Sequence, residues 1–237
     1  MVDPARKEHS PELFNAIALR YDRVNAVVSF GLNGSWKRRV GGHLPSAKGL
    51  RCLDLATGTG DVALDLLRYP RVSGVVGIDP AEGMLAVARR KAERRGLLSR
   101  AAFVSADAQR LPFSDGSFDV VTVAFGLRNM PHPVRALSEA WRVLRPSGRL
   151  MVLEFSRPPF PVFRQVHYFY VAHLLPGLGF LMTGDLPAYR YLHRTIMAFP
   201  EAGRLGRMIA QTGFSILARE DLLWGTAVLY AGEKKNL

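Results

Sequence analysis

Three aspartates lie at or near the ends of successive apolar segments, where carboxylates could hold a polar ligand. Asp54 lies on the first segment, Asp79 ends the second and Asp107 follows the third. If these segments are parallel strands, the acids meet at the sheet edge where such folds bind ligands. Each acid also has a structural interpretation, Asp54 as an acceptor for turn N–H groups and Asp107 as a cap. Together they predict a binding site.

A glycine turn, Gly58-Thr59-Gly60, separates the first predicted strand from a helix. Glycines allow a ligand to approach the backbone closely, and Asp79 follows 19 residues after Gly60, as in sites that bind a ribose. Dinucleotides and the adenosine of S-adenosylmethionine both use this arrangement. A dinucleotide fingerprint would have a third glycine where Ala63 stands, and Asp54 would repel a pyrophosphate. The turn therefore favours S-adenosylmethionine, with Asp54 near its amino group, Asp79 on the ribose, and Asp107 and the Ala108 N–H on the adenine.

The elements that must position these residues alternate between short apolar strands and helices from Leu50 onwards. This alternation predicts an α/β fold with a mostly parallel sheet and helices on both faces. We expect a single domain over 1–237, comprising an N-terminal helical lid at 10–43, a cofactor-binding core at 50–156, an insertion for substrate at 157–199 and a C-terminal helix and strands at 200–237. The strands are expected at 50–55, 74–79, 101–106, 118–125, 149–155, 214–219 and 225–231.

Composition limits the function classes. Hydrophobic residues make up 48% of the chain, and the net charge is +12, which suits a nucleic-acid or anionic-membrane partner. The 26 arginines are scattered through helices rather than gathered in one tract, which weakens the nucleic-acid interpretation. The lone Cys52 is expected to be buried and inert. With no signal-like start and no long apolar run, we expect a cytoplasmic protein.

Several motifs together resemble class I S-adenosylmethionine methyltransferases, and more narrowly the ubiquinone/menaquinone biosynthesis C-methyltransferase family. They cover most of the chain: 53–61, 77–79, 106–113, 118–119, 125–129, 153–156, the block 21–37 and the run 184–192. The resemblance implies a Rossmann-like seven-stranded fold, and cofactor contacts from Thr59, Asp79, Asp107 and Ala108. One departure is Ala124, where members acting on ubiquinone precursors carry serine, and this favours the menaquinone side.

For the reaction, the resemblance implies C-methylation of a polyprenyl quinol, with demethylmenaquinol as the expected acceptor. We expect Arg128 to stabilise the phenolate, Asn129 to orient a ring oxygen and Tyr21 to relay a proton. Each also has a structural interpretation: Arg128 in an ion pair, Asn129 in a turn and Tyr21 in packing. No residue stands out as the general base, although His167, His173 and His193 are candidates. No metal site is expected.

The aromatic segment 160–182 suits either an apolar channel for the tail or an ordinary helix pair covering the sheet. With the positive charge, it predicts transient docking on an anionic membrane surface from the cytoplasmic side, and a homodimer is left open. Two alternative functions fit the sequence less well. An RNA methyltransferase would need a base-gripping motif after the fourth strand, where Phe125-Gly126-Leu127-Arg128 stands instead, and a nicotinamide-dependent oxidoreductase is disfavoured by Asp54.

Overall fold

The computed structural model describes residues 10–29, 31–177, 180 and 186–235. A seven-stranded sheet in the order β3-β2-β1-β4-β5-β7-β6 forms its centre. The strands are β1 (Leu50–Leu55), β2 (Val72–Asp79), β3 (Ala101–Ser105), β4 (Phe118–Ala124), β5 (Leu144–Phe155), β6 (Phe214–Leu222) and β7 (Ala227–Lys234). Pairing is parallel throughout except along β7, which runs antiparallel to both of its neighbours. The predicted mostly parallel α/β sheet is confirmed.

Helices cover both faces because adjacent strand residues point to opposite sides. On one face, Cys52 and Val75 pack with α3 (Leu32–Val40), α4 (Asp61–Leu66) and α5 (Glu82–Arg94). On the other, Leu53 and Leu55 pack with α6 (Pro133–Val143) and α10 (Ala202–Gln211). Cys52 is a buried free thiol, as expected, and burial raises its pKa to about 12.

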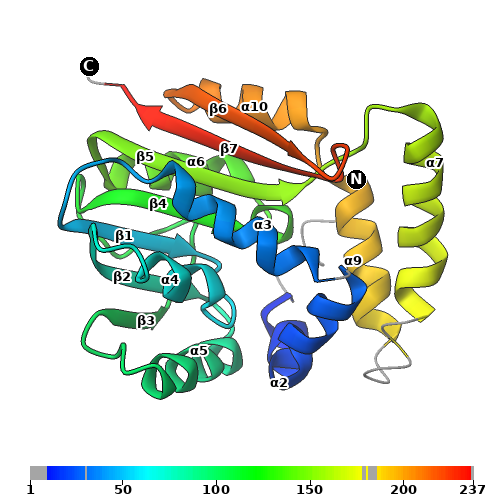
Figure 1. Cartoon of the computed structure of the whole chain (residues 1–237), viewed down its shortest axis with the longest axis horizontal. Helices are drawn as coiled ribbons and strands as arrows, with labels where there is room; N and C mark the ends of the chain where they lie inside the picture. The colour runs from blue at the N-terminus through cyan, green and yellow to red at the C-terminus, as the bar shows by residue number, and fades with distance from the viewer. Residues whose placement is uncertain (1–9, 30, 178–179, 181–185, 236–237) are drawn as a thin grey trace.

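The remaining helices gather beyond the carboxyl ends of the parallel strands (Figure 1). Among the described residues they are α2 (Ser10–Val28), α7 (Pro161–Phe169), the π-helical turn η3 (Tyr170–Leu174) and α9 (Leu186–Ala198). Two short turns, η1 (Gly41–His43) and η2 (Leu127–Asn129), also belong to the described chain. Strand order reverses between β1 and β4, so a crevice opens at the end of β1. The helices of the N-terminal segment and the insertion stand around this crevice.

The elements differ in several details from the sequence expectation; β2, for example, begins at Val72 and β6 ends at Leu222. β5 begins at Leu144 rather than at 149, since Phe118 pairs with Leu144 before an irregularity shifts the register to Arg149. The aromatic segment has no clean period in the sequence because α7 passes into a π turn, which changes the helical repeat. β7 begins two residues later than expected and extends to Lys234. Residues 184–185, the start of the predicted run at 184–192, lie outside the described residues.

Candidate functional site

The glycine turn closes against the end of β2. Thr57 N–H donates to the Ile78 carbonyl at 2.9 Å, and Gly58 N–H donates to Asp79 Oδ2 at 2.9 Å. Both glycines have positive φ, for different reasons. A Cβ on Gly58 would meet no protein atom within 4 Å, whereas a Cβ on Gly60 would lie 2.9 Å from the Ala88 Cβ. Gly58 thus leaves open space for a ligand, and Gly60 allows α5 to pack closely.

Asp79 is held in place by its own neighbours. Its second oxygen, Oδ1, accepts from the Ala81 N–H at 2.9 Å, and the side chain is 8% exposed. Burial raises the pKa of Asp79, and the two backbone N–H donors act in the opposite direction. Each carboxylate oxygen keeps a lone pair, so the group can still accept from ligand hydroxyls.

Asp54 is the most deeply buried of the three acids. Its oxygens accept from the Thr57 hydroxyl at 2.6 Å and the Thr122 hydroxyl at 2.5 Å. Burial raises the pKa of Asp54 to about 6, although both hydroxyl bonds and the charge of Lys37 lower it. The carboxylate is therefore poised to respond to a nearby cation.

Two cavities open at this edge of the sheet. The smaller, of about 280 Å³, is lined by Asp79, Asp107 and Ala108, together with Pro11, Phe14, Met84 and the 129–131 turn. Asp107 is exposed, and its Oδ1 accepts from the Gln109 N–H at 2.8 Å, which is the capping arrangement considered above. The structure thus brings Asp79, Asp107 and Ala108 into one cavity.

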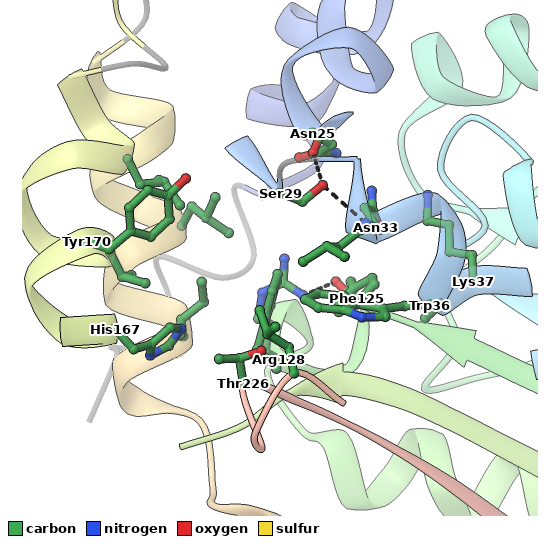
Figure 2. A pocket seen from close by; sticks show the side chains of 18 of the residues that line it. Asn25, Ser29, Asn33, Trp36, Lys37, Phe125, Arg128, His167, Tyr170 and Thr226 are labelled. Carbon is green, nitrogen blue, oxygen red and sulfur yellow. Dashed lines mark hydrogen bonds between the residues drawn. The ribbon is translucent and has the colours of Figure 1, made fainter. Parts of the chain in front are cut away.

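The larger cavity, of about 390 Å³, extends from Asp54 and Thr59 towards the aromatic helices. Figure 2 shows His167 and Tyr170 on one side, facing Trp36, Phe125 and Arg128 on the other. The polar residues Asn25, Ser29, Asn33 and Lys37 come from α2, α3 and the turn between them, and apolar side chains of α7, η3 and α9 form much of the remaining wall. Burial lowers the pKa of His167, so its imidazole is neutral at pH 7.

The two cavities meet at a shared wall, which we call the junction: Tyr21, Ala56, Gly58, Ala124 and Phe125 line both. A molecule that fills the smaller cavity and reaches towards Asp54 must pass this wall. The junction is therefore where groups bound on the two sides would come into contact.

Arg128 forms a buried ion pair beside the junction. Its Nη1 donates to Glu154 Oε1 at 2.8 Å and also to the Phe125 carbonyl, and the two side chains are 4% and 0% exposed. Glu154 also accepts from the backbone N–H groups of Arg128 and Phe155. The ion-pair interpretation is confirmed. Arg128 still lines the larger cavity, so a substrate-facing role stays a prediction.

Several buried polar atoms around the cavities have no hydrogen-bond partner among the described residues. They are Arg128 Nε, Asn129 Oδ1, Asn33 Oδ1 and His167 Nδ1, and all four residues line one of the two cavities. Buried polar atoms normally find partners, so their concentration here indicates a place for a polar ligand. Asn129 Nδ2 reaches the Phe125 carbonyl at 3.4 Å.

An ionic cluster fastens α2 and α3 to the core. Lys91 of α5 contacts Asp22 at 2.5 Å and Asp61 at 2.6 Å, Lys37 contacts Asp61 at 3.0 Å, and the Thr59 hydroxyl donates to Asp22 at 2.6 Å. Lys37 and Lys91 hold the pKa of Asp61 at about 2 against the effect of burial. This cluster was not predicted from the sequence. Its signals there are Asp61, directly after the glycine turn, and Lys91, on the following helix.

Other lining residues were also missed. Asn25, Ser29 and Asn33 follow one another at four-residue intervals, which places them on one side of a helical segment, and Trp36 continues the pattern. Two partners were missed because they come from distant strands of the sheet. They are Thr122, which bonds to Asp54, and Glu154, which pairs with Arg128. Tyr21 lies at the junction with its ring edge-on to Phe14. The described residues contain no metal-binding cluster, and none of their helices is long and apolar enough to cross a bilayer.

Comparison with known proteins now decides the family. The model of the ubiE/COQ5 methyltransferase family matches residues 3–234. The chain belongs to this family. It is 48% identical to a demethylmenaquinone methyltransferase of Thermus thermophilus (94% of this chain and 100% of that protein), and 44% identical to one of Deinococcus radiodurans (94% and 92%). It is 39% identical to the ubiquinone/menaquinone biosynthesis C-methyltransferase UbiE of Geobacter sulfurreducens (96% and 89%).

Solved structures show the same fold. The [4+2]-cyclase SpnF superposes with a TM-score of 0.69 at 20% identity, covering 95% of both chains. A SAM-dependent methyltransferase of Thermotoga maritima gives 0.66 at 20% identity, covering 94% of this chain and 99% of that one. The protein is thus a methyltransferase with a Rossmann-like fold, and its family uses S-adenosylmethionine, as the sequence predicted.

Proposed function

We propose that this methyltransferase transfers a methyl group from S-adenosylmethionine to a ring carbon of demethylmenaquinol. The observation that carries the proposal is the junction, where a cavity edged by acids meets a mainly apolar one. The relatives named as demethylmenaquinone methyltransferases support the choice of acceptor.

The residues present fit the cofactor. In this assignment Asp107 and the Ala108 N–H hold the adenine, Asp79 accepts from the ribose hydroxyls, and Gly58 leaves the space beside the backbone. Asp54 lies further along, in the larger cavity, where its carboxylate suits an ammonium group. When bound, S-adenosylmethionine supplies a methyl group on a positively charged sulfur. The assigned contacts would bring that sulfur to the junction.

The larger cavity suits a quinol with an apolar tail. Asn25, Ser29 and Asn33 offer hydrogen bonds for ring oxygens, whereas Phe163, Leu175 and Ile196 offer apolar contacts for a prenyl chain. At about 390 Å³ the cavity has the size of a typical small-molecule site.

The chain's own contribution to the chemistry is alignment and charge. A ring carbon becomes nucleophilic as the neighbouring hydroxyl loses its proton, and the Arg128 guanidinium lies where it can stabilise the resulting oxyanion. Glu154 and the Phe125 carbonyl fix the guanidinium before the substrate arrives. The half-buried Asn129 amide is placed to orient a polar group near the junction, and the Tyr21 hydroxyl to relay a proton. His167, whose imidazole lines the same cavity, is the candidate general base, acting directly or through a water.

The pKa of Asp54 gives a pH prediction. Because only the ionised carboxylate attracts the ammonium group, affinity for S-adenosylhomocysteine should be constant above about pH 6. Below that pKa it should fall by up to about tenfold per pH unit. Calorimetry from pH 5 to 8 measures this. The Asp54→Asn variant should bind S-adenosylhomocysteine weakly at every pH, with a flatter pH profile of affinity. The affinity for 5′-methylthioadenosine, which lacks the amino group, should be the same in the wild type and in Asp54→Asn. An unchanged acid limb in Asp54→Asn would show that another group titrates.

A methylation assay tests the function directly. Labelled S-adenosylmethionine is supplied with reduced demethylmenaquinone carrying a short, water-soluble tail and, separately, with tRNA. We expect label on the quinol ring carbon alone. Label found only in the RNA would overturn the proposal in favour of the nucleic-acid alternative, which the net charge of +12 first suggested.

A further inference from the structure

The outer side of α7 and the adjoining β6–β7 turn expose large apolar side chains. Val162 is 77% exposed, Trp224 64% and Phe160 59%. Val166 and Phe169 are each 59% exposed and follow Val162 at intervals of four and three residues, so the three share one stripe of the helix. The Phe163 ring meets Trp224 edge-on at 4.8 Å, which joins the turn to the helix. We call Phe160, Val162, Val166, Phe169 and Trp224 the apolar face.

The apolar face borders the mouth of the substrate cavity. Val166 and Phe169 belong both to the face and to the cavity lining, and their neighbours Phe163, His167 and Tyr170 line the same cavity from the next stripe of the helix. α7 stands outermost at this end of the molecule (Figure 1). Apolar side chains of α7 therefore continue from the face into the cavity lining, where they offer contacts to a long apolar substrate.

The insertion that carries α7 is rich in positive charge, whereas Glu201 and Asp221 lie beside Arg157 and Arg164 at its border. Residues 157–200 contain four arginines, Arg157, Arg164, Arg190 and Arg194, and a single acidic residue, Asp185. An apolar helix stripe accompanied by arginines is the pattern of helices that lie in the interface of anionic bilayers. The Trp224 ring suits the headgroup level of such an interface.

We propose that the apolar face is the surface by which the protein docks on an anionic lipid bilayer, with the cavity mouth turned towards the lipid. The inference deepens the proposed function and rests on it in one respect, because a polyprenyl quinol resides in the bilayer. A second copy of the chain is the less suitable occupant, since a twofold contact through this face would bring the arginine-rich insertions of two copies against each other.

Vesicle flotation tests the docking. Wild-type protein is mixed with vesicles of phosphatidylglycerol and phosphatidylcholine, and with phosphatidylcholine alone. We expect binding to the anionic vesicles at low salt, decreasing as salt is added. Val162→Glu and Phe160→Glu place a carboxylate on the face at side chains outside the cavity lining. Each should weaken vesicle binding about tenfold or more, and methylation of the short-tailed soluble quinol should stay near the wild-type rate.

The matched control is Leu98→Glu, which makes the same chemical change at a 52% exposed residue beyond α5, away from α7. It should bind vesicles like the wild type. Equal weakening in Leu98→Glu and Val162→Glu, or no vesicle binding by the wild type, would overturn the docking proposal. The proposal would also be overturned if sedimentation shows that the wild-type protein is a dimer and that Val162→Glu converts it to a monomer. Vesicle binding without methylation of any quinol would instead overturn the proposed function and leave the docking surface standing.

Discussion

Replacing Arg128 with methionine is expected to lower the free energy of unfolding by about 3–5 kcal/mol and to slow the methyl-transfer step at least about a hundredfold. The stability loss follows because Glu154, which is fully buried, loses the guanidinium that compensates its carboxylate. The activity loss follows because the substrate oxyanion loses its donor. Denaturant unfolding and single-turnover methylation of the soluble quinol measure the two effects.

A double variant separates them. The double variant Arg128→Met, Glu154→Gln removes both buried charges. The amide oxygen of the new glutamine can still accept hydrogen bonds from the backbone N–H groups of residues 128 and 155. Most of the lost stability should return, because a neutral buried pair carries no unpaired charge. Activity should stay low. If activity returns together with stability, Arg128 is a structural residue and the oxyanion role is wrong.

Asp79→Ala is expected to weaken binding of S-adenosylhomocysteine by about 3 kcal/mol or more, roughly a hundredfold, since charge-assisted hydrogen bonds to the ribose are lost. The Gly58 and Ala81 N–H groups also lose their acceptor, so the glycine turn loses its fastening to β2. Isothermal titration calorimetry gives the affinity, and thermal unfolding shows whether the fold is retained.

Asp107→Ala serves as the comparison. Its carboxylate is exposed and already accepts from Gln109, so its loss should cost roughly tenfold in affinity, the value of about one hydrogen bond to a neutral group. Asp79→Asn keeps one acceptor oxygen, so its loss of affinity should lie between those of Asp79→Ala and Asp107→Ala. Equal affinities in the wild type and Asp79→Ala would mean that the ribose contact is wrongly assigned.

The strand–turn–helix alternation sufficed to predict the sheet and the gathering of Asp79, Asp107 and Ala108, because parallel strands present their carboxyl ends at one edge. It could not predict the limits of β5, where an irregularity moves the register between Leu144 and Arg149. The antiparallel β7 was found as a strand, but its position between β5 and β6 depends on long-range pairing that no local pattern specifies.

The site was predictable where one segment carries the chemistry and was missed where two distant segments share it. Gly58 and Asp79 were identified from local spacing. Glu154, 26 residues from its partner Arg128, and Asp22, whose partner Lys91 lies on another helix, were not. Ion pairs of this kind are set by how elements pack, and one sequence gives no measure of that packing. The division of the chain into lid, core and insertion, and the homodimer, remain predictions.

The shared wall of the two cavities implies a rule for the order in which molecules leave. The methyl group would cross at the junction, which is lined by Tyr21, Ala56, Gly58, Ala124 and Phe125. Before transfer the cofactor carries this methyl group and after transfer the quinol carries it, so the junction holds one methyl group at a time. A methylated quinol and a new S-adenosylmethionine would each place a methyl group at the junction. The two groups would clash there, because a packed site does not accommodate an extra methyl group without strain. Spent cofactor and product quinol fit together; new cofactor must wait until the product has left. The methylated lipid would thus leave before the next S-adenosylmethionine binds.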